Sequence, residues 1–143
     1  MSRADLSYAY AQARLQSRFG ERPHTSDWQH LEATRDVGAV LQVVRAGRLA
    51  RWTARITSRP GVHELERRLR EEWMRAVDEV ASWQPGHWRE GTRWMRWITY
   101  LPALQKLARG GRAPAWMRAD PILGPIVARE PRERGPSLAG TPL

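Results

Sequence analysis

Residues 62–83, VHELERRLREEWMRAVDEVASW, form the stretch that decides the fold. Apolar side chains recur along it every three or four residues, at Val62, Leu65, Leu69, Trp73, Ala76, Val77, Val80 and Trp83. This spacing places them on one face of an α-helix, which can then be buried. The other side carries charged pairs four residues apart, Glu64–Arg68, Glu66–Arg70, Glu71–Arg75 and Arg75–Glu79. Such a pattern is typical of a solvated helix face, so the stretch predicts the longest helix of the chain.

The sequence before this stretch predicts further helices. Residues 4–19 contain no helix breaker and carry two apolar stripes, Leu6, Ala9, Tyr10, Ala13 and Tyr8, Leu15, Phe19. A helix with apolar residues on two sides is usually packed on both. Ser26 followed by Gln29 has the spacing of a capping box and predicts the start of a short helix that reaches Ala33. Asp36 is a favourable N-cap for the next helix, which Gly47 would end.

The sequence after the long helix predicts the remaining elements. A helix is expected from His87 to Tyr100, with a kink or restart at Pro102 and an end at Gly110-Gly111. Asp120-Pro121 predicts a short helix reaching Val127. No alternating strand pattern is present, so the expected fold is all-α, a single-domain bundle of about five to seven helices over residues 1–128. Residues 129–143 are rich in Pro, Gly and Arg, which predicts a disordered tail.

The composition limits the location and the partners. Cysteine is absent, no apolar run approaches the length of a membrane span, and residues 1–15 lack the apolar core of a secretory signal, so we expect a cytoplasmic location. The net charge of +9 suits nucleic acid, an anionic membrane surface or an acidic protein. Lys106 is the only lysine. The excess of arginine has two explanations, a GC-rich genome or bidentate contacts with carboxylate or phosphate.

Tryptophan is the most informative residue type in this chain. Eight tryptophans occur in 143 residues, and five of them lie between Trp73 and Trp97. In the helix expected at 87–100, one half carries Trp88, Trp94, Met95, Trp97, Ile98 and Leu101, and the other half carries Arg89, Arg93 and Arg96. The tryptophans are either core or a docking patch, and the arginines are either solvated or a row of anion contacts. We take Arg89, Arg93, Trp94, Arg96 and Trp97 as the candidate interaction residues.

Residue sets that carry chemistry are missing from the sequence. His24, His30, His63 and His87 lack the spacing of zinc ligands, and no G-x-S-x-G elbow is present. Gly110-Gly111 is not followed by the G-K-[ST] of a phosphate loop. We therefore expect no catalytic, cofactor or metal site, and a protein that is not an enzyme.

Two segments resemble a known family, the C subunit (also called the d subunit) of V-type and A-type ATPases. Residues 6–15, LSYAYAQARL, resemble its first-helix signature Y-x-N-A-R, with Gln12 in the place of the family's Asn. Residues 28–33 and 36–41 are similar to its next short helices. Residues 89–110, REGTRWMRWITYLPALQKLARG, resemble the family's stretch in which a Leu-rich helix runs into D-[LI]-x-N-L, with Tyr100 and Ala103 in the places of the family's Asp and Asn. The resemblance implies a helical wedge or bundle and a subunit on the cytoplasmic side of a membrane complex, which it couples to a stalk.

The function expected from these observations is that of a helical subunit or adaptor without enzymatic activity. It would dock on a larger, membrane-associated protein complex, so that the chain lies at the inner face of the membrane through its partner. A basic accessory protein that binds nucleic acid is the second hypothesis. A helical regulator that forms homodimers through exposed tryptophan is the third.

Overall fold

The computed structural model describes residues 3–56, 60–130 and 133, and their side chains from Leu6 onward. Within these ranges every regular element is helical, so the predicted all-α class is confirmed. The internal contacts group the chain into two units, Met1–Arg93 and Trp94–Leu143, and each is described by itself. The single domain expected over residues 1–128 stays a prediction. Of the expected disordered tail, only Arg129, Glu130 and Glu133 lie within the described residues.

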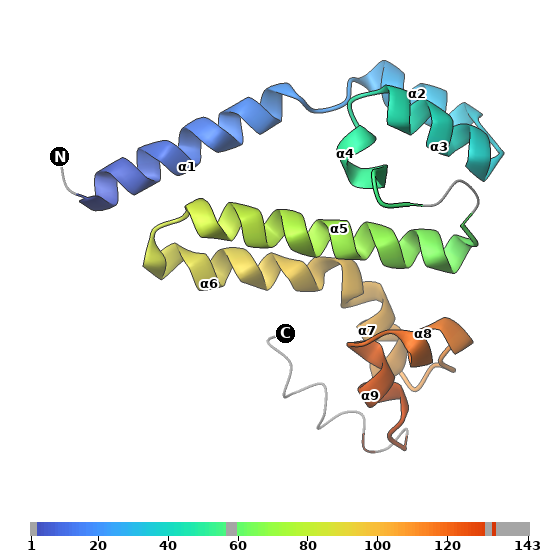
Figure 1. The fold of residues 1–143 in the computed structure, drawn as a ribbon. Helices are drawn as coiled ribbons and strands as arrows, with labels where there is room; N and C mark the ends of the chain where they lie inside the picture. The colour runs from blue at the N-terminus through green and yellow to red at the C-terminus, as the bar shows by residue number, and fades with distance from the viewer. Residues whose placement is uncertain (1–2, 57–59, 131–132, 134–143) are drawn as a thin grey trace. The chain divides into compact units, whose positions relative to one another are not determined.

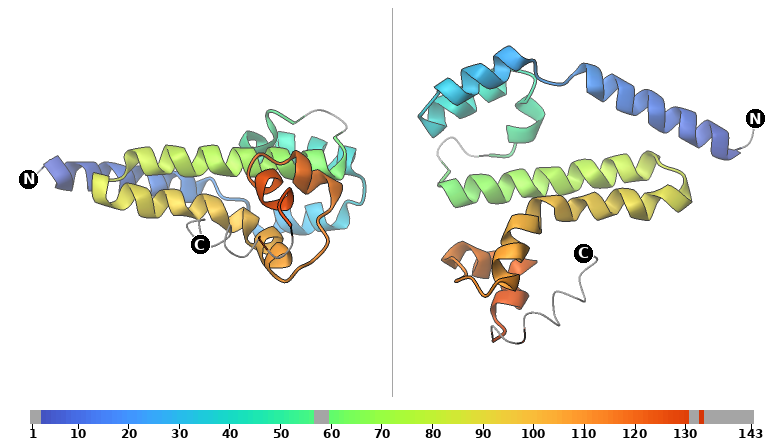
Figure 2. Two further views of the ribbon diagram at one scale, coloured as in Figure 1. Left: turned by 90° about the horizontal axis from the view of Figure 1, so that it is seen from below. Right: turned by 180° about the vertical axis from the view of Figure 1, so that it is seen from behind.

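The first unit contains α1 (Arg3–Gly20), α2 (Thr25–Ala33), α3 (Val37–Ala46), α4 (Ala50–Thr53), α5 (Val62–Trp83) and most of α6 (Gly86–Trp94) (Figure 1). The bounds of α5 agree with the sequence pattern that predicted the longest helix. All three views show α6 antiparallel to α5 and beside it, after a tight turn at Gln84 and Pro85 (Figure 2). Helices α1 and α4 both contact α5, and α3 contacts α2 and α4.

The buried side chains that the structure describes in the first unit come from four of its helices. They are Ala11 of α1, Leu41 and Val44 of α3, Thr53 and Ile56 at α4, and Val77, Ala81 and Trp83 of α5. The indoles of Trp52 on α4 and Trp73 on α5 stack with their ring centroids 6.4 Å apart. Apolar burial of this kind is the main stabilising contribution to a small helical unit.

The helix caps show one prediction confirmed and one corrected. The Asp36 carboxylate accepts a hydrogen bond from the Ala39 amide at 2.8 Å, so the predicted cap of α3 is confirmed. The capping box predicted at Ser26 is wrong, because α2 already begins at Thr25 and Ser26 lies inside it. His24 takes the N-cap position in an extended conformation, and the Asp27 carboxylate accepts its amide N–H at 2.7 Å. An acidic residue three positions after the N-cap suits the first helical turn.

The second unit contains η1 (Met95–Tyr100), α7 (Leu101–Ala108), α8 (Ala115–Ala119) and α9 (Leu123–Val127). The continuous α-helix expected from 87 to 100 is therefore wrong after Trp94, because residues 95–100 form a 3₁₀ helix. Pro102 has no amide N–H to donate to the Ile98 carbonyl, which favours tighter hydrogen bonding in the preceding turn. Accordingly, the Leu101 amide bonds to the carbonyls of both Ile98 and Trp97.

Two local motifs shape the rest of the second unit. At the predicted glycine stop, Gly110 has a φ of +74°, and the Gly111 and Gly110 amides bond to the carbonyls of Lys106 and Leu107 at 2.9 and 3.0 Å. This is a Schellman motif, in which the left-handed position favours glycine. The buried Asp120 carboxylate accepts from the Ile122 and Leu123 amides and caps α9, as predicted. The core is Tyr100, Leu104, Leu107, Met117, Leu123, Ile126 and Val127.

None of the helices within the described residues is both long and apolar enough to cross a membrane.

Candidate docking surfaces

Two of the predicted interaction residues, Arg89 and Arg93, lie on α6 in the first unit. Arg89 is half-buried, and its Nη2 donates to the Gln84 carbonyl at 3.4 Å. Arg93 bonds to Glu90 at 2.6 Å, and its Nε lies 3.9 Å from the Asp78 carboxylate on α5. Both arginines therefore make contacts within the unit, and α6 does not present them as an uncommitted row of anion contacts.

The other three predicted residues, Trp94, Arg96 and Trp97, belong to the second unit and are described with it. Trp94 is 42% exposed. Arg96 is half-buried, and so is Trp97, whose ring meets the buried ring of Tyr100 edge-on at a centroid distance of 6.3 Å. Trp94 is thus the more exposed of the two tryptophans among the five candidates. The role of the set in binding stays a prediction.

The tryptophans divide between core and surface, which their spacing alone did not decide. Trp83 is buried, and Trp52 and Trp73 are half-buried. Trp28 on α2 and Trp88 on α6 are exposed at 49% and 58%. Trp28 and Trp88 lie on different helices, and single exposed apolar side chains are common on protein surfaces, so neither alone defines a docking patch. Neither Trp28 nor Trp88 is among the five candidates, although Trp88 shares the predicted apolar half with Trp94.

Helix α1 contacts α5 through a set of residues that we call the α1–α5 seam, made of Ala11, Arg14, Arg18, Glu79 and Trp83. Arg18 forms an ion pair with Glu79, and the Nη2 atom of Arg14 lies 4.0 Å from the same carboxylate. The guanidinium carbons of Arg18 and Arg14 lie 4.6 and 4.7 Å from the centroid of the buried Trp83 ring. The seam therefore holds α1 by charge and cation–π contacts around a single small apolar residue, Ala11.

Two acidic side chains of α5 reach neighbouring helices, and one of them, Glu79, belongs to the face predicted to be solvated. Glu79 faces α1, and it also lies 4.0 Å from Arg51 of α4. The Glu72 side chain is 15% exposed, pairs with Arg75 and lies 4.0 Å from Arg55. The spacing of carboxylates along one helix does not distinguish those that pair with another helix from those that face solvent. The sequence pattern of α5 does not show which other helices pack beside it.

The first turns of α5 do form a surface ion network, as the spacing predicted for Glu64 and Arg68. Arg68 Nε bonds to Glu64 at 2.9 Å, and Arg67 Nη2 bonds to the same carboxylate at 2.7 Å. Glu71 completes the network by pairing with both arginines. The hydrogen bond from Arg67 is the main reason why the pKa of Glu64 lies below its ordinary value.

The two apolar stripes of α1 are exposed, so the predicted packing on two sides is wrong. We use the name α1 outer face for the exposed large side chains on both sides of the contact with α5, Leu6 and Tyr10 on one side and Tyr8, Leu15 and Phe19 on the other. Phe19 is 62% exposed and Tyr8 is 56% exposed, whereas the small residue Ala11 is buried. At about 100° per residue, Ala11 and Arg18 fall between the two stripes, so contact with α5 leaves both stripes beside the seam.

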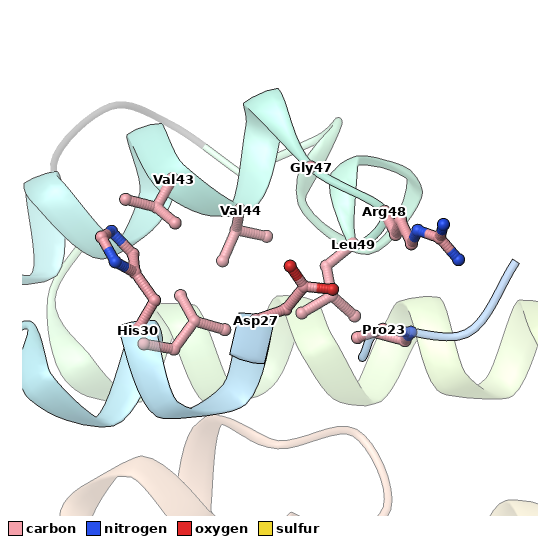
Figure 3. Close-up of a pocket in the computed structure, with 9 residues that line it drawn as sticks. Pro23, Asp27, His30, Val43, Val44, Gly47, Arg48 and Leu49 are labelled. Atoms are coloured by element: carbon pink, nitrogen blue, oxygen red, sulfur yellow. The ribbon is translucent and has the colours of Figure 1, made fainter. Parts of the chain in front are cut away.

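Hollows of different size lie in the first unit, and one of about 910 Å³ lies along α3, where Asp36, Gln42 and Arg45 are among its lining residues. One pocket between α2 and α3 has a volume of about 80 Å³, and the close-up shows Val43 and Val44 of α3 facing α2 across it (Figure 3). Drug-sized ligands occupy about 300–1,000 Å³. A larger hollow beside α5 contains Arg18, Arg51, Glu72, Arg75 and Glu79, which form ion pairs with one another. No group of His, Asp and Glu in the described part of the chain could hold a metal ion.

Comparisons with family models, with curated proteins and with solved structures give no match to this chain.

Proposed function

We propose that this chain is a helical subunit or adaptor without enzymatic activity, which docks on a larger, membrane-associated protein complex. The observation that carries the proposal is the exposure of the α1 outer face. An isolated helix is marginally stable in water, and most helices in proteins are stabilised by packing of an apolar face. Helix α1 buries Ala11 but exposes Leu6, Tyr8, Tyr10, Leu15 and Phe19. Full burial of a large apolar side chain contributes about 1.5–3 kcal/mol, and covering the exposed part of each of these contributes a fraction of that.

The charges around this face favour a partner with an apolar patch and an acidic rim. The Arg22 guanidinium lies 3.9 Å from the Phe19 ring centroid, and that of Arg14 lies 5.7 Å from the Tyr10 ring centroid. Exposed rings flanked by arginine are the composition of interface hot spots. The net charge of +9 also favours approach to an acidic surface. The exposed rings of Trp88 and Trp94 are further contact candidates.

The resemblance to the C subunit (d subunit) of V-type and A-type ATPases supports the same proposal. The segment that resembles the family's first-helix signature, residues 6–15, overlaps the α1 outer face. In this proposal the chain is one helical unit at the inner face of the membrane, and its partners belong to the membrane complex. Binding of nucleic acid is the second candidate function, favoured by the net charge.

Capture from native extract tests the proposal. The full chain with a C-terminal tag is recovered with its partners, half of the sample is treated with nuclease, and the partners are identified by mass spectrometry. The double variant Tyr8→Ala/Phe19→Ala is compared with the control Val62→Ala, which shortens an exposed apolar side chain on α5. We expect membrane-complex subunits that survive nuclease and fall about tenfold with the double variant, while the control retains them. Partners that vanish with nuclease would favour nucleic acid, and partners unaffected by the double variant would contradict docking through α1.

A further inference from the structure

A basic cleft lies in the second unit between the end of α7 and the start of α8. Its volume is about 450 Å³, within the range of about 300–1,000 Å³ that is typical of ligand sites. Lys106 comes from α7, Arg112 from the connecting loop and Arg118 from α8, and the rest of the lining is Ala113, Pro114 and Ala115. Three positive charges thus converge on one cleft that no acidic side chain of the described residues lines.

The second unit holds few carboxylates that could compensate these three charges. The unit has three carboxylates, Asp120, Glu130 and Glu133. Asp120 is buried and caps α9, and no ion pair joins any of the three to a cation of the cleft in the described part of the chain. Residues 131–132 and 134–143 contain no Asp or Glu. In the hollow of the first unit, by contrast, Arg18 and Arg75 pair with Glu79 and Glu72.

Close backbone approaches hold the walls of the cleft in place. A Cβ atom on Gly111 would lie 2.8 Å from both the Cγ and the carbonyl oxygen of Lys106. The backbone of the loop at Gly111 therefore packs directly against Lys106. A Cβ atom on Gly124 would lie 2.8 Å from the Arg118 carbonyl oxygen, so α9 packs equally closely on the other wall. Walls fixed in this way lower the cost of ordering the site when a ligand binds.

We propose that this cleft binds a phosphate monoester group, carried by a free small molecule or by a lipid headgroup. Arginine donates two parallel hydrogen bonds to phosphate oxygens, and lysine adds a compact positive charge. A cluster of three cations around one hollow fits a single group of high charge. A nucleic-acid backbone instead favours cations spread along a track. The site lies in the second unit, whereas the α1 outer face lies in the first, so this proposal does not depend on the docking proposal.

Binding to two probes at constant ionic strength tests the proposal on the full chain. Isothermal titration with glycerol 3-phosphate, a phosphate monoester, represents the free ligand. Phosphatidylcholine vesicles with and without phosphatidic acid represent the lipid. The variants are Arg112→Gln and Arg118→Gln, which keep much of the apolar stem. Arg109→Gln is the matched control, because it removes one exposed positive charge of the same unit from outside the cleft.

We expect binding in at least one of the two arms, and the arm that binds identifies the source of the phosphate. Each cleft variant lowers the affinity about tenfold, whereas Arg109→Gln changes it less than about twofold. Circular dichroism checks the fold of each variant. If one of the two cleft variants loses helicity, the affinity of the other cleft variant is used for the test. Absence of binding to both probes would overturn the proposal. So would an equal loss in all three variants, or tighter binding of an oligouridylate that all three variants weaken equally, because these results indicate net charge alone.

Discussion

Replacement of Trp83 by alanine tests how α1 is held to the rest of the first unit. Trp83 is 7% exposed, and the guanidinium groups of Arg14 and Arg18 lie over its ring at 4.7 and 4.6 Å. Large-to-small replacement of a buried tryptophan costs about 3–5 kcal/mol. Each cation–π contact contributes about 0.5–1 kcal/mol, which places the expected loss toward the upper end of that range.

Urea unfolding followed by circular dichroism measures this loss. The matched control is Trp28→Ala, because Trp28 is half-exposed on α2, and we expect it to cost about 1 kcal/mol or less. Arg18→Ala should cost about 0.5–1 kcal/mol less in the Trp83→Ala background than in the wild type, since the ring it covers is gone. Equal costs for the two tryptophan variants, or no coupling between Arg18 and Trp83, would refute the arrangement described for the α1–α5 seam.

Three further predictions concern single helices. Asp36→Ala removes the bond to the Ala39 amide and should lower the free energy of unfolding by about 0.5–2 kcal/mol in urea titrations, whereas Asp36→Ser should retain most of it. Gly110→Ala places a Cβ at a φ of +74° and should cost about 1 kcal/mol by thermal unfolding, and no loss would contradict the left-handed turn. The pKa of Glu64 is lowered below its ordinary value of 4.5, mainly by Arg67, so its ionised form is favoured in the folded state. This contribution is present above pH 4.5 and is lost as the pH falls through the lowered pKa, so the unfolding midpoint of wild type should fall more steeply there than that of Glu64→Gln. If the unfolding midpoints of wild type and Glu64→Gln change with pH in parallel, the stabilising role of the Glu64 carboxylate is contradicted.

Local signals in the sequence account for much of the fold. The helix over residues 62–83, the Asp36 cap and the glycine stop at 110–111 depend on residues within a few positions of one another. Apolar spacing and capping chemistry act at that range, which is why they were predictable. Two exceptions are Ser26, where His24 with Asp27 provided a cap two residues earlier, and residues 95–100, which form a 3₁₀ helix before Pro102.

Contacts between helices were not predictable from one helix at a time. The pairing of Glu79 with Arg18 joins residues 61 positions apart, and nothing in the α5 pattern marks Glu79 as different from a solvated residue. The exposure of α1 is similar, because its stripes indicate apolar sides without showing whether this chain or another molecule covers them. For the basic cleft, the sequence showed a glycine stop between Lys106 and Arg112 but not the position of Arg118.

Hydrogen exchange on α1, in the isolated chain and in the captured complex, tests the docking proposal most directly. In the isolated chain the amides of residues 6–20 should exchange quickly, since the seam is the main support of this helix. In the complex the same amides should become strongly protected, while those of α3, whose Leu41 and Val44 are already buried, change little. Unchanged exchange in α1 on binding would contradict the claim that a partner covers its outer face.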